Sequence, residues 1–310
     1  MCHYPRRVGP ALLHNRAGVI IIMGMLLIRG SYRIQGAAPD GDSVRFYPDD
    51  PAEWDLVPGP HLVRRNASGG AQLRLDGIDA LESHYATTGG VVHQPLEFAH
   101  DAAAELLKWL GFTKVVRDTK ETVTSSTPVQ TPGYILTRNA DINGRCVAIV
   151  GRGKAPAASA TDVFVDAAMV RKSANYHLLQ RGLVYPTFYR NLFPDLRLAM
   201  AKAAQQAQAA SRGLWPWDHT RTGVKVASVE TVVDEIIMWP KLFRRLVDYL
   251  VLGGDDASLA GFPDYLAQRA DRYIVLSTGH ATTGLDLVVK VTGQTLKLTR
   301  PYEDLLFEEK

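Results

Sequence analysis

The stretch from Leu73 to Glu82 restricts the fold of this chain more than any other. It reads Leu-Arg-Leu-Asp-Gly-Ile-Asp-Ala-Leu-Glu. Its first residues alternate, so Leu73 and Leu75 face one side of a strand while Arg74 and Asp76 face the other. A glycine and two further carboxylates follow directly. The pattern predicts a strand that leads from a buried core into a tight turn with charged side chains.

A second segment of the same kind lies upstream. Asp40-Gly41-Asp42 reads as a turn, and the alternation from Ser43 to Tyr47 predicts the strand that leaves it. Asp42 and Asp79 therefore both stand at turns, and carboxylate oxygens are the ligands that Ca²⁺ and Mg²⁺ take. We expect the two turns to bring acidic side chains to one divalent cation.

The side chains around these turns suit the hydrolysis of a phosphodiester. That reaction needs a water, a base and positive charge near the phosphorus. Glu82, close to Asp79, is placed to orient or deprotonate the water, and the Ala80 carbonyl is a further candidate metal ligand. Arg74 and Arg145 supply forked donors for phosphate oxygens. Taken singly, each residue also fits an ordinary role as turn former, cap or surface ion pair, so only their joint occurrence favours a site.

Length and composition indicate a globular protein. The 310 residues suggest two domains, and 46% hydrophobic with 22% charged residues is typical of globular chains. The net charge of +3 is compatible with a polyanionic substrate but does not identify one. Cys2 and Cys146 are the two cysteines, and we expect no structural disulfide between them.

The N-terminal part carries an apolar run from Val19 to Ile28. The run imitates the core of a signal peptide but is far shorter than the ~20 residues of a membrane span. We favour a buried strand, with residues 1–17 as an irregular tail, and expect no stable membrane association. The compartment stays open between cytoplasm and secretion.

The rest of the first domain, 18–218, shows clear element boundaries. Pro95 and Gly111 bound a predicted helix, and Ser173 and Gly182 bound a shorter one. A third helix is expected from Pro194 to Arg212. Asn143-Gly144 predicts a hairpin that places Arg145 at the start of a strand.

The second predicted domain, 224–310, shows no evident chemistry. A helix is expected from Pro240 to Leu252, and its cluster of Lys241, Arg244 and Arg245 is interpreted as a solvated face. Strands are expected at 273–277, 285–291 and 295–299. This domain is a candidate for binding a protein partner.

The set of motifs and its order resemble the staphylococcal nuclease-like (thermonuclease) family over about 19–217. The matching pieces are Asp40-Gly41-Asp42-Ser43, Arg74 to Glu82, Gly144-Arg145, Arg181-Gly182-Leu183 and Ser211 to Trp215. Leu81 departs from the family, which usually has proline at that position. The resemblance implies an α+β fold with a five-stranded oligonucleotide-binding (OB) barrel and packed helices, followed by a small C-terminal α+β domain.

The resemblance also implies roles for particular residues. Asp42, Asp79 and the Ala80 carbonyl would bind Ca²⁺. Glu82 would act as general base or position the water, and Arg74 and Arg145 would contact the phosphate and the transition state. Tyr185 and Tyr189 would stack on bases. The expected activity is a calcium-dependent nuclease that acts on DNA, RNA or both with little sequence specificity. The alternative is a nucleic-acid-binding or scaffolding module of the same fold that has lost efficient turnover.

Overall fold

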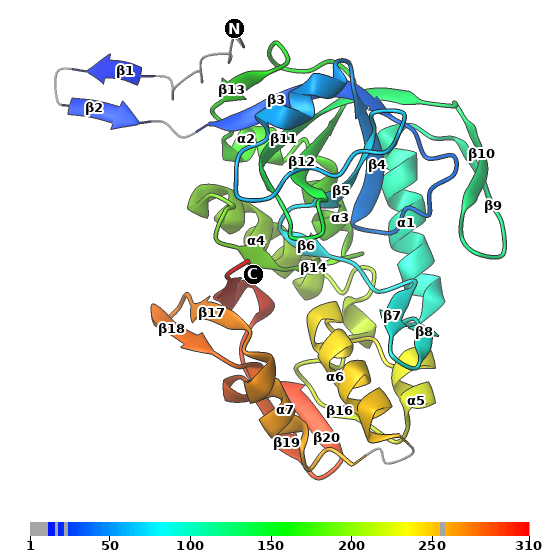
Figure 1. The fold of residues 1–310 in the computed structure, drawn as a ribbon. Helices are drawn as coiled ribbons and strands as arrows, with labels where there is room; N and C mark the ends of the chain where they lie inside the picture. The colour runs from blue at the N-terminus through cyan, green and yellow to red at the C-terminus, as the bar shows by residue number, and fades with distance from the viewer. Residues whose placement is uncertain (1–11, 16–17, 22–23, 255–257, 310) are drawn as a thin grey trace, which may run out of the picture.

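A computed structural model of the protein describes residues 12–15, 18–21, 24–254 and 258–309. The structure is mixed α+β, with a β-barrel above and a smaller C-terminal region below in the view of Figure 1. Among the residues described, no helix is both long enough and apolar enough to span a bilayer.

Five strands form a closed barrel. Around the barrel they follow the order β3 (Met25–Tyr32), β4 (Ser43–Pro48), β5 (Ala71–Leu75), β12 (Cys146–Arg152) and β11 (Thr131–Ala140). Strand β11 pairs back onto β3 and closes the ring. Strands β5 and β12 run parallel, and the other neighbouring pairs run antiparallel. The expectation of a five-stranded barrel is therefore confirmed.

The alternation in β5 works as predicted. Leu73 and Leu75 are fully buried in the barrel core, while Arg74 points to the other side, toward the cleft described below. The hairpin between β11 and β12 also forms as predicted. Gly144 has a φ of 79°, and the Asp141 carboxylate accepts the backbone N–H groups of Asn143 and Arg145.

The predicted helices form with small changes at their ends. Helix α1 (Leu96–Leu110) ends at Gly111, and α3 (Ala174–Arg181) is capped by Ser173 and ends at Gly182. Helix α4 (Pro194–Ala209) ends three residues before the predicted Arg212. The remaining helices are α2 (Ala167–Val170), α5 (Val229–Asp234), α6 (Pro240–Gly253) and α7 (Phe262–Arg269), with 3₁₀ turns η1 (Pro51–Leu56), η2 (Trp215–Trp217), η3 (Leu285–Leu287) and η4 (Tyr302–Asp304).

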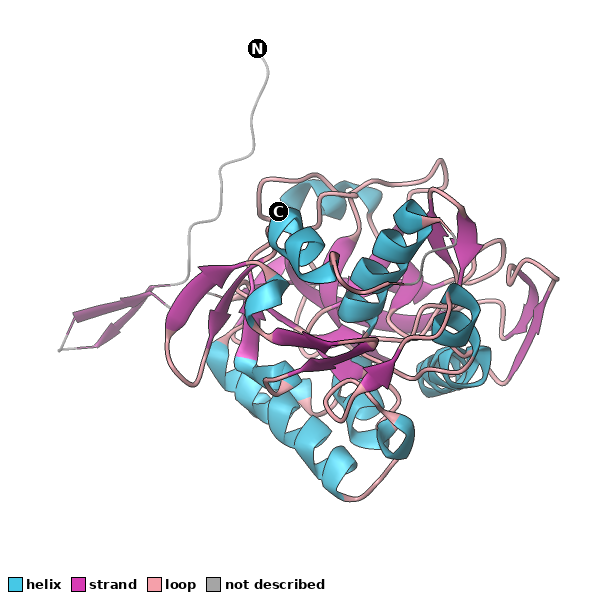
Figure 2. Ribbon diagram, turned by 90° about the horizontal axis from the view of Figure 1, so that it is seen from below, coloured by secondary structure: helices cyan, strands magenta, loops and turns pink. Residues whose placement is uncertain are grey.

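Short strands complete the structure. They are β1 (Leu12–Asn15), β2 (Gly18–Ile21), β6 (Ile78–Asp79), β7 (Tyr85–Thr87), β8 (Gly90–Val92), β9 (Lys114–Arg117), β10 (Val123–Thr127), β13 (Thr161–Val163), β14 (Tyr185–Pro186), β15 (Phe188–Tyr189), β16 (Val224–Lys225), β17 (Arg272–Val275), β18 (His280–Thr283), β19 (Val289–Thr292), β20 (Thr295–Leu298) and β21 (Leu305–Phe307). Strands β1 and β2 pair with each other and stand away from the barrel in Figure 2. The expected irregular tail is therefore wrong for residues 12–15, and its residues 1–11 and 16–17 lie outside the described part.

The C-terminal region is tied to the barrel region by a shared sheet and a shared aromatic cluster. Strand β21 pairs parallel with β15, and Tyr302 packs its ring 5.1 Å from that of Tyr185. The strand expected at 285–291 is only partly right, because its first residues form η3 and β19 begins at Val289.

Candidate functional site

A cleft of about 860 Å³ lies between the barrel and the C-terminal region. It collects Asp42, Arg74, Asp79, Glu82 and Arg145 from three separate segments of the barrel region. These are the five side chains that the sequence proposes as metal ligands and catalytic groups. The opposite wall comes from α6, the start of β17 and the last residues of the chain.

Close backbone packing holds the two acidic turns together. A Cβ atom on Gly41 would lie 2.6 Å from that of Ala102 in α1 and 2.7 Å from that of Ala80. Only glycine therefore fits between the two turns and the helix. The same approach lets the backbone N–H of Ala80 donate to Asp42 Oδ2 at 3.4 Å. The Asp-Gly-Asp pattern thus sets how near the carboxylates lie.

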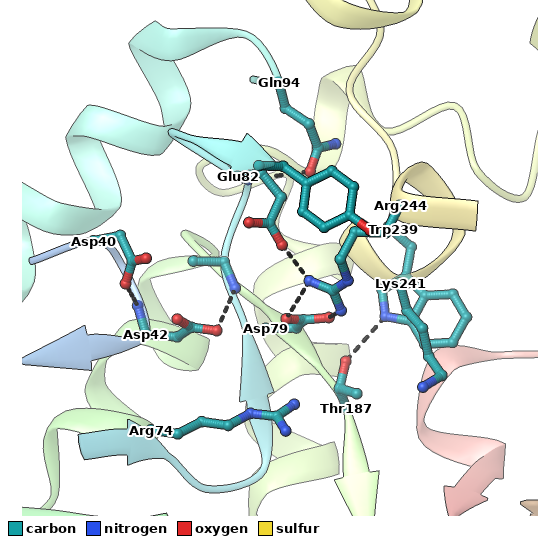
Figure 3. A network of polar contacts seen from close by, with 12 residues as sticks. Asp40, Asp42, Arg74, Asp79, Glu82, Gln94, Thr187, Trp239, Lys241 and Arg244 are labelled. Atoms are coloured by element: carbon teal, nitrogen blue, oxygen red, sulfur yellow. Dashed lines mark hydrogen bonds and ion pairs between the residues drawn. The ribbon is translucent and has the colours of Figure 1, made fainter. Parts of the chain in front are cut away.

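Asp42 sits in a carboxylate-rich environment. Burial raises its pKa well above the usual range, and the neighbouring Asp40 and Asp79 raise it further. The Arg74 guanidinium lowers the pKa of Asp42 without offsetting those effects. Figure 3 shows Asp40, Asp42 and Asp79 close to one another, with Glu82 directly above. This cluster of four carboxylates needs positive charge close by.

Arg74 supplies part of that charge from β5. Its guanidinium lies 4.8 Å from the centre of the Tyr189 ring, and its Nη2 donates to the Tyr189 hydroxyl at 3.4 Å. Burial alone would lower the pKa of Arg74, but Tyr189, Asp79 and Asp42 together raise it. Arg74 is therefore a fixed cation on the floor of the cleft.

The two tyrosines expected to stack on bases differ in position. Tyr185 is fully buried, its ring packs in T-shaped contacts against those of Trp215 and Tyr302, and its hydroxyl donates to Asp218 at 3.0 Å. The expectation that Tyr185 stacks on a base is wrong for this arrangement, because no face of its ring is open. Tyr189 lines the cleft, so its stacking role stays a prediction.

Tyr189 is surrounded by cations. Lys241 Nζ lies 3.4 Å from its hydroxyl, and Arg74 contacts it from the barrel side. Burial alone would raise the pKa of Tyr189, but Lys241 and Arg74 outweigh it and lower the pKa to about 8.

Arg145 reaches the cleft from the start of β12. Its Nε donates to Asp141 Oδ2 at 2.7 Å, and 37% of its side chain is exposed. Asp141 holds both the hairpin backbone and this guanidinium. Arg145 is thus a more exposed cation than Arg74, oriented by a buried carboxylate.

Arg244 is the site residue that the sequence interpretation missed. From α6 its Nη2 donates to Asp79 Oδ2 at 2.8 Å and its Nη1 to Asp79 Oδ1 at 3.3 Å, and Nη1 also contacts Glu82 Oε1 (Figure 3). The expectation that Lys241, Arg244 and Arg245 form a solvated face is wrong. Lys241 is 8% exposed, and the side chains of Arg244 and Arg245 are 20% and 13% exposed. Each of the three has an acidic partner.

No local pattern marks Arg244. Its acidic partners lie 162 and 165 positions earlier in the chain. Burial raises the pKa of Glu82 above its ordinary value, although Arg244 opposes that shift. Burial would lower the pKa of Arg244 itself, but Asp79 and Glu82 raise it well above the ordinary value. The pair is an ion pair in which each side stabilises the charge of the other.

Arg244 occupies part of the site at which a metal ion is expected. Within the described ranges, no group of three or more His, Cys, Asp or Glu side chains is arranged to hold a metal ion. The donor types nevertheless suit Ca²⁺, because Asp40, Asp42, Asp79 and Glu82 all offer oxygen. Both carboxylate oxygens of Asp79 instead accept hydrogen bonds from the Arg244 guanidinium.

No protein-family model matches the sequence, and no curated protein matches it either. The residue pattern and the geometry of this cleft are therefore what indicate a function.

Proposed function

We propose that this protein is a calcium-dependent nuclease, similar to the staphylococcal nuclease-like family, that hydrolyses phosphodiester bonds of DNA, RNA or both with little sequence specificity. One observation carries the proposal. The five side chains assigned to this chemistry come from positions 42 to 145 and line one cleft. An unrelated set of turn formers and surface ion pairs has no reason to converge in this way.

The fold is consistent with the proposal. The five-stranded closed barrel supports an OB fold, whose barrels bind oligonucleotides through one face and its loops. Arg74 lies on strand β5 of the barrel, and Arg145 lies where the β11–β12 hairpin returns to it. Positive charge thus lies both on strand β5 and at the β11–β12 hairpin of the barrel.

The residues of the chain take distinct roles in this proposal. Glu82 accepts the proton of the attacking water, and burial raises its pKa above the ordinary value, which makes it a stronger base. Arg74 and Arg145 donate to the phosphate oxygens, where negative charge develops in the transition state. Bound calcium, held by Asp42 and Asp79, would supply Lewis-acid polarisation of the phosphate.

A second function has a specific observation in its favour. Arg244 neutralises Asp79 and Glu82, the candidate ligand and the candidate base. A protein that keeps this pairing when substrate is present would bind nucleic acid through the arginines of the cleft without cleaving it. This second candidate is a nucleic-acid-binding module of the same fold.

A calcium titration of cleavage separates the two candidates. We expect single-stranded DNA, double-stranded DNA or RNA to be cut with added Ca²⁺, and chelator to stop the reaction. Glu82→Gln should lower kcat by about 10²- to 10⁴-fold, the usual contribution of a general base. Glu97→Gln, on the exposed face of α1, is the matched control and should retain activity.

Two results would count against the nuclease. Cleavage that survives both chelator and Glu82→Gln would contradict the assigned base and metal. Binding of all three nucleic acids in chelator, with no cleavage at any calcium concentration, would favour the binding module.

A further inference from the structure

The C-terminal region places a cation directly on the candidate metal ligands. Arg244 bridges Asp79 and Glu82, so one guanidinium spans two carboxylates that lie three positions apart in the same segment. Asp79 is almost fully buried, and its side chain is only 3% exposed. A buried carboxylate without a cation is strongly unfavourable, so a positive charge beside Asp79 stabilises the folded protein.

Helix α6 is held near the site by contacts that do not involve Arg244. The Trp239 N–H donates to Thr220 Oγ1 at 2.8 Å, and its indole N–H donates to Thr187 Oγ1 at 2.9 Å. Gln94, fully buried, accepts the Glu82 N–H at 3.2 Å and donates to the Met238 carbonyl at 2.8 Å. The start of α6 is therefore fixed to the loop that carries Glu82.

A third anchor lies further along the same helix. The Tyr85 hydroxyl contacts both carboxylate oxygens of Asp248, at 3.1 and 3.0 Å. Arg244 lies between this anchor and Trp239, so the helix presents its side chain to the carboxylates whether or not the ion pair forms.

A guanidinium and a calcium ion need the same oxygen atoms. Ca²⁺ binds carboxylate oxygens at about 2.3 to 2.6 Å, inside the distance that Arg244 keeps from Asp79. Two cations on the same buried carboxylate repel each other strongly, because solvent screening is weak there. The adjacent Arg245 gives an internal comparison, since it pairs with Asp271 at 2.8 Å and not with the turn carboxylates.

We propose that Arg244 is a resident cation of the carboxylate site and sets its affinity for calcium, because Ca²⁺ must displace the guanidinium from Asp79 and Glu82. The inference rests on the proposed function and adds a residue to it. Arg244 acts here as a positioning and affinity-setting residue, and it belongs to a part of the chain that the family resemblance does not cover. The C-terminal region thereby makes the barrel site weaker for calcium than its carboxylates alone would be.

Calorimetric titration with Ca²⁺ alone tests the inference without any activity readout. The full-length protein, Arg244→Gln and Arg245→Gln are each titrated after dialysis against chelator. We expect Arg244→Gln to bind Ca²⁺ about 10- to 100-fold more tightly than the unaltered chain, a usual range for coupling between two sites. Arg245→Gln removes the same charge from the same helix and should bind like the unaltered chain.

Arg244→Lys provides a second variant in case Arg244→Gln does not fold. A lysine keeps the charge but cannot span two carboxylates, so we expect a smaller gain in calcium affinity. Equal affinity in the unaltered chain and in whichever variant folds would overturn the inference and leave the proposed nuclease intact.

The absence of calcium binding in every protein would also overturn the inference. The cleavage assay then decides the fate of the proposed function separately. Calcium-dependent cleavage by the same samples would retain the nuclease, and no cleavage would remove it as well.

Discussion

The barrel and the C-terminal region contribute to the same cleft in different ways. The barrel supplies Arg74, Asp79 and Glu82 from one short stretch, so the spacing of these residues in the sequence already shows that they lie together. The C-terminal region supplies Arg244, which is 162 and 165 positions from its acidic partners. Chemistry that lies within one turn can be predicted from its pattern, whereas a counterion supplied by a distant helix depends on the tertiary fold.

Contacts between distant residues also join the two predicted domains. The predicted boundary lies between 218 and 224, yet contacts cross it in the sheet and in the core. Trp239 packs its ring 6.0 Å from that of Tyr302 and donates its indole N–H to Thr187. Truncation at Thr222 would therefore expose buried aromatic rings of the barrel region. Such a truncation tests packing as well as partner binding, which stays a prediction for residues 224–310.

After Glu82→Gln, the largest loss of turnover should come from the barrel arginines, and from Arg74 above all. We expect Arg74→Ala to lower kcat by about 10²- to 10³-fold and Arg145→Ala by about 10-fold, with smaller changes in substrate binding. Arg74 is held against Tyr189 beside the carboxylates, whereas Arg145 is partly exposed and shared with Asp141. Steady-state kinetics on a short DNA, with nucleic-acid affinity measured separately, provide the test.

The same kinetic measurements also compare the barrel arginines with Arg244 of the C-terminal region. If Arg244→Gln lowered kcat as much as Arg74→Ala does, the C-terminal arginine would belong to the transition-state contacts. Losses in Arg74→Ala that fall equally on binding and on turnover would contradict its assigned role.

A separate effect concerns stability and pH. Burial, followed by the approach of Glu309 from the C-terminal region, raises the pKa of Asp76 to about 7. In the unfolded chain this carboxyl titrates near 4, so the folded state keeps its proton over a range where the unfolded state loses it. The free energy of unfolding should therefore fall as the pH rises from about 4 to 7, by up to about 4 kcal/mol.

Urea denaturation at several pH values measures how the free energy of unfolding changes with pH. Asp76→Asn has no carboxyl to ionise, so its free energy of unfolding should not show this contribution, and its advantage over the unaltered chain should be largest above pH 7. Parallel pH profiles for the two proteins would show that Asp76 keeps an ordinary pKa.

Much of the fold could be predicted because its signals are local. The Asn143-Gly144 turn, the Ser173 cap and the glycine helix ends involve atoms a few residues apart. The position of Tyr185 could not be predicted, because its burial depends on Trp215 and on Tyr302 from the far end of the chain. The turn patterns in the sequence predict the carboxylates and Arg74. The ion pairs that these carboxylates form depend on Arg244, which no turn pattern marks.

A double-mutant cycle between Asp79→Asn and Arg244→Gln tests most directly whether the C-terminal region completes the barrel site. The free energy of unfolding is measured for all four proteins in chelator, so that no calcium contributes. We expect a coupling of about 1 to 3 kcal/mol, because either substitution alone removes an ion-pair partner from a charge that stays buried. Effects that add to within about 0.5 kcal/mol would contradict a shared site.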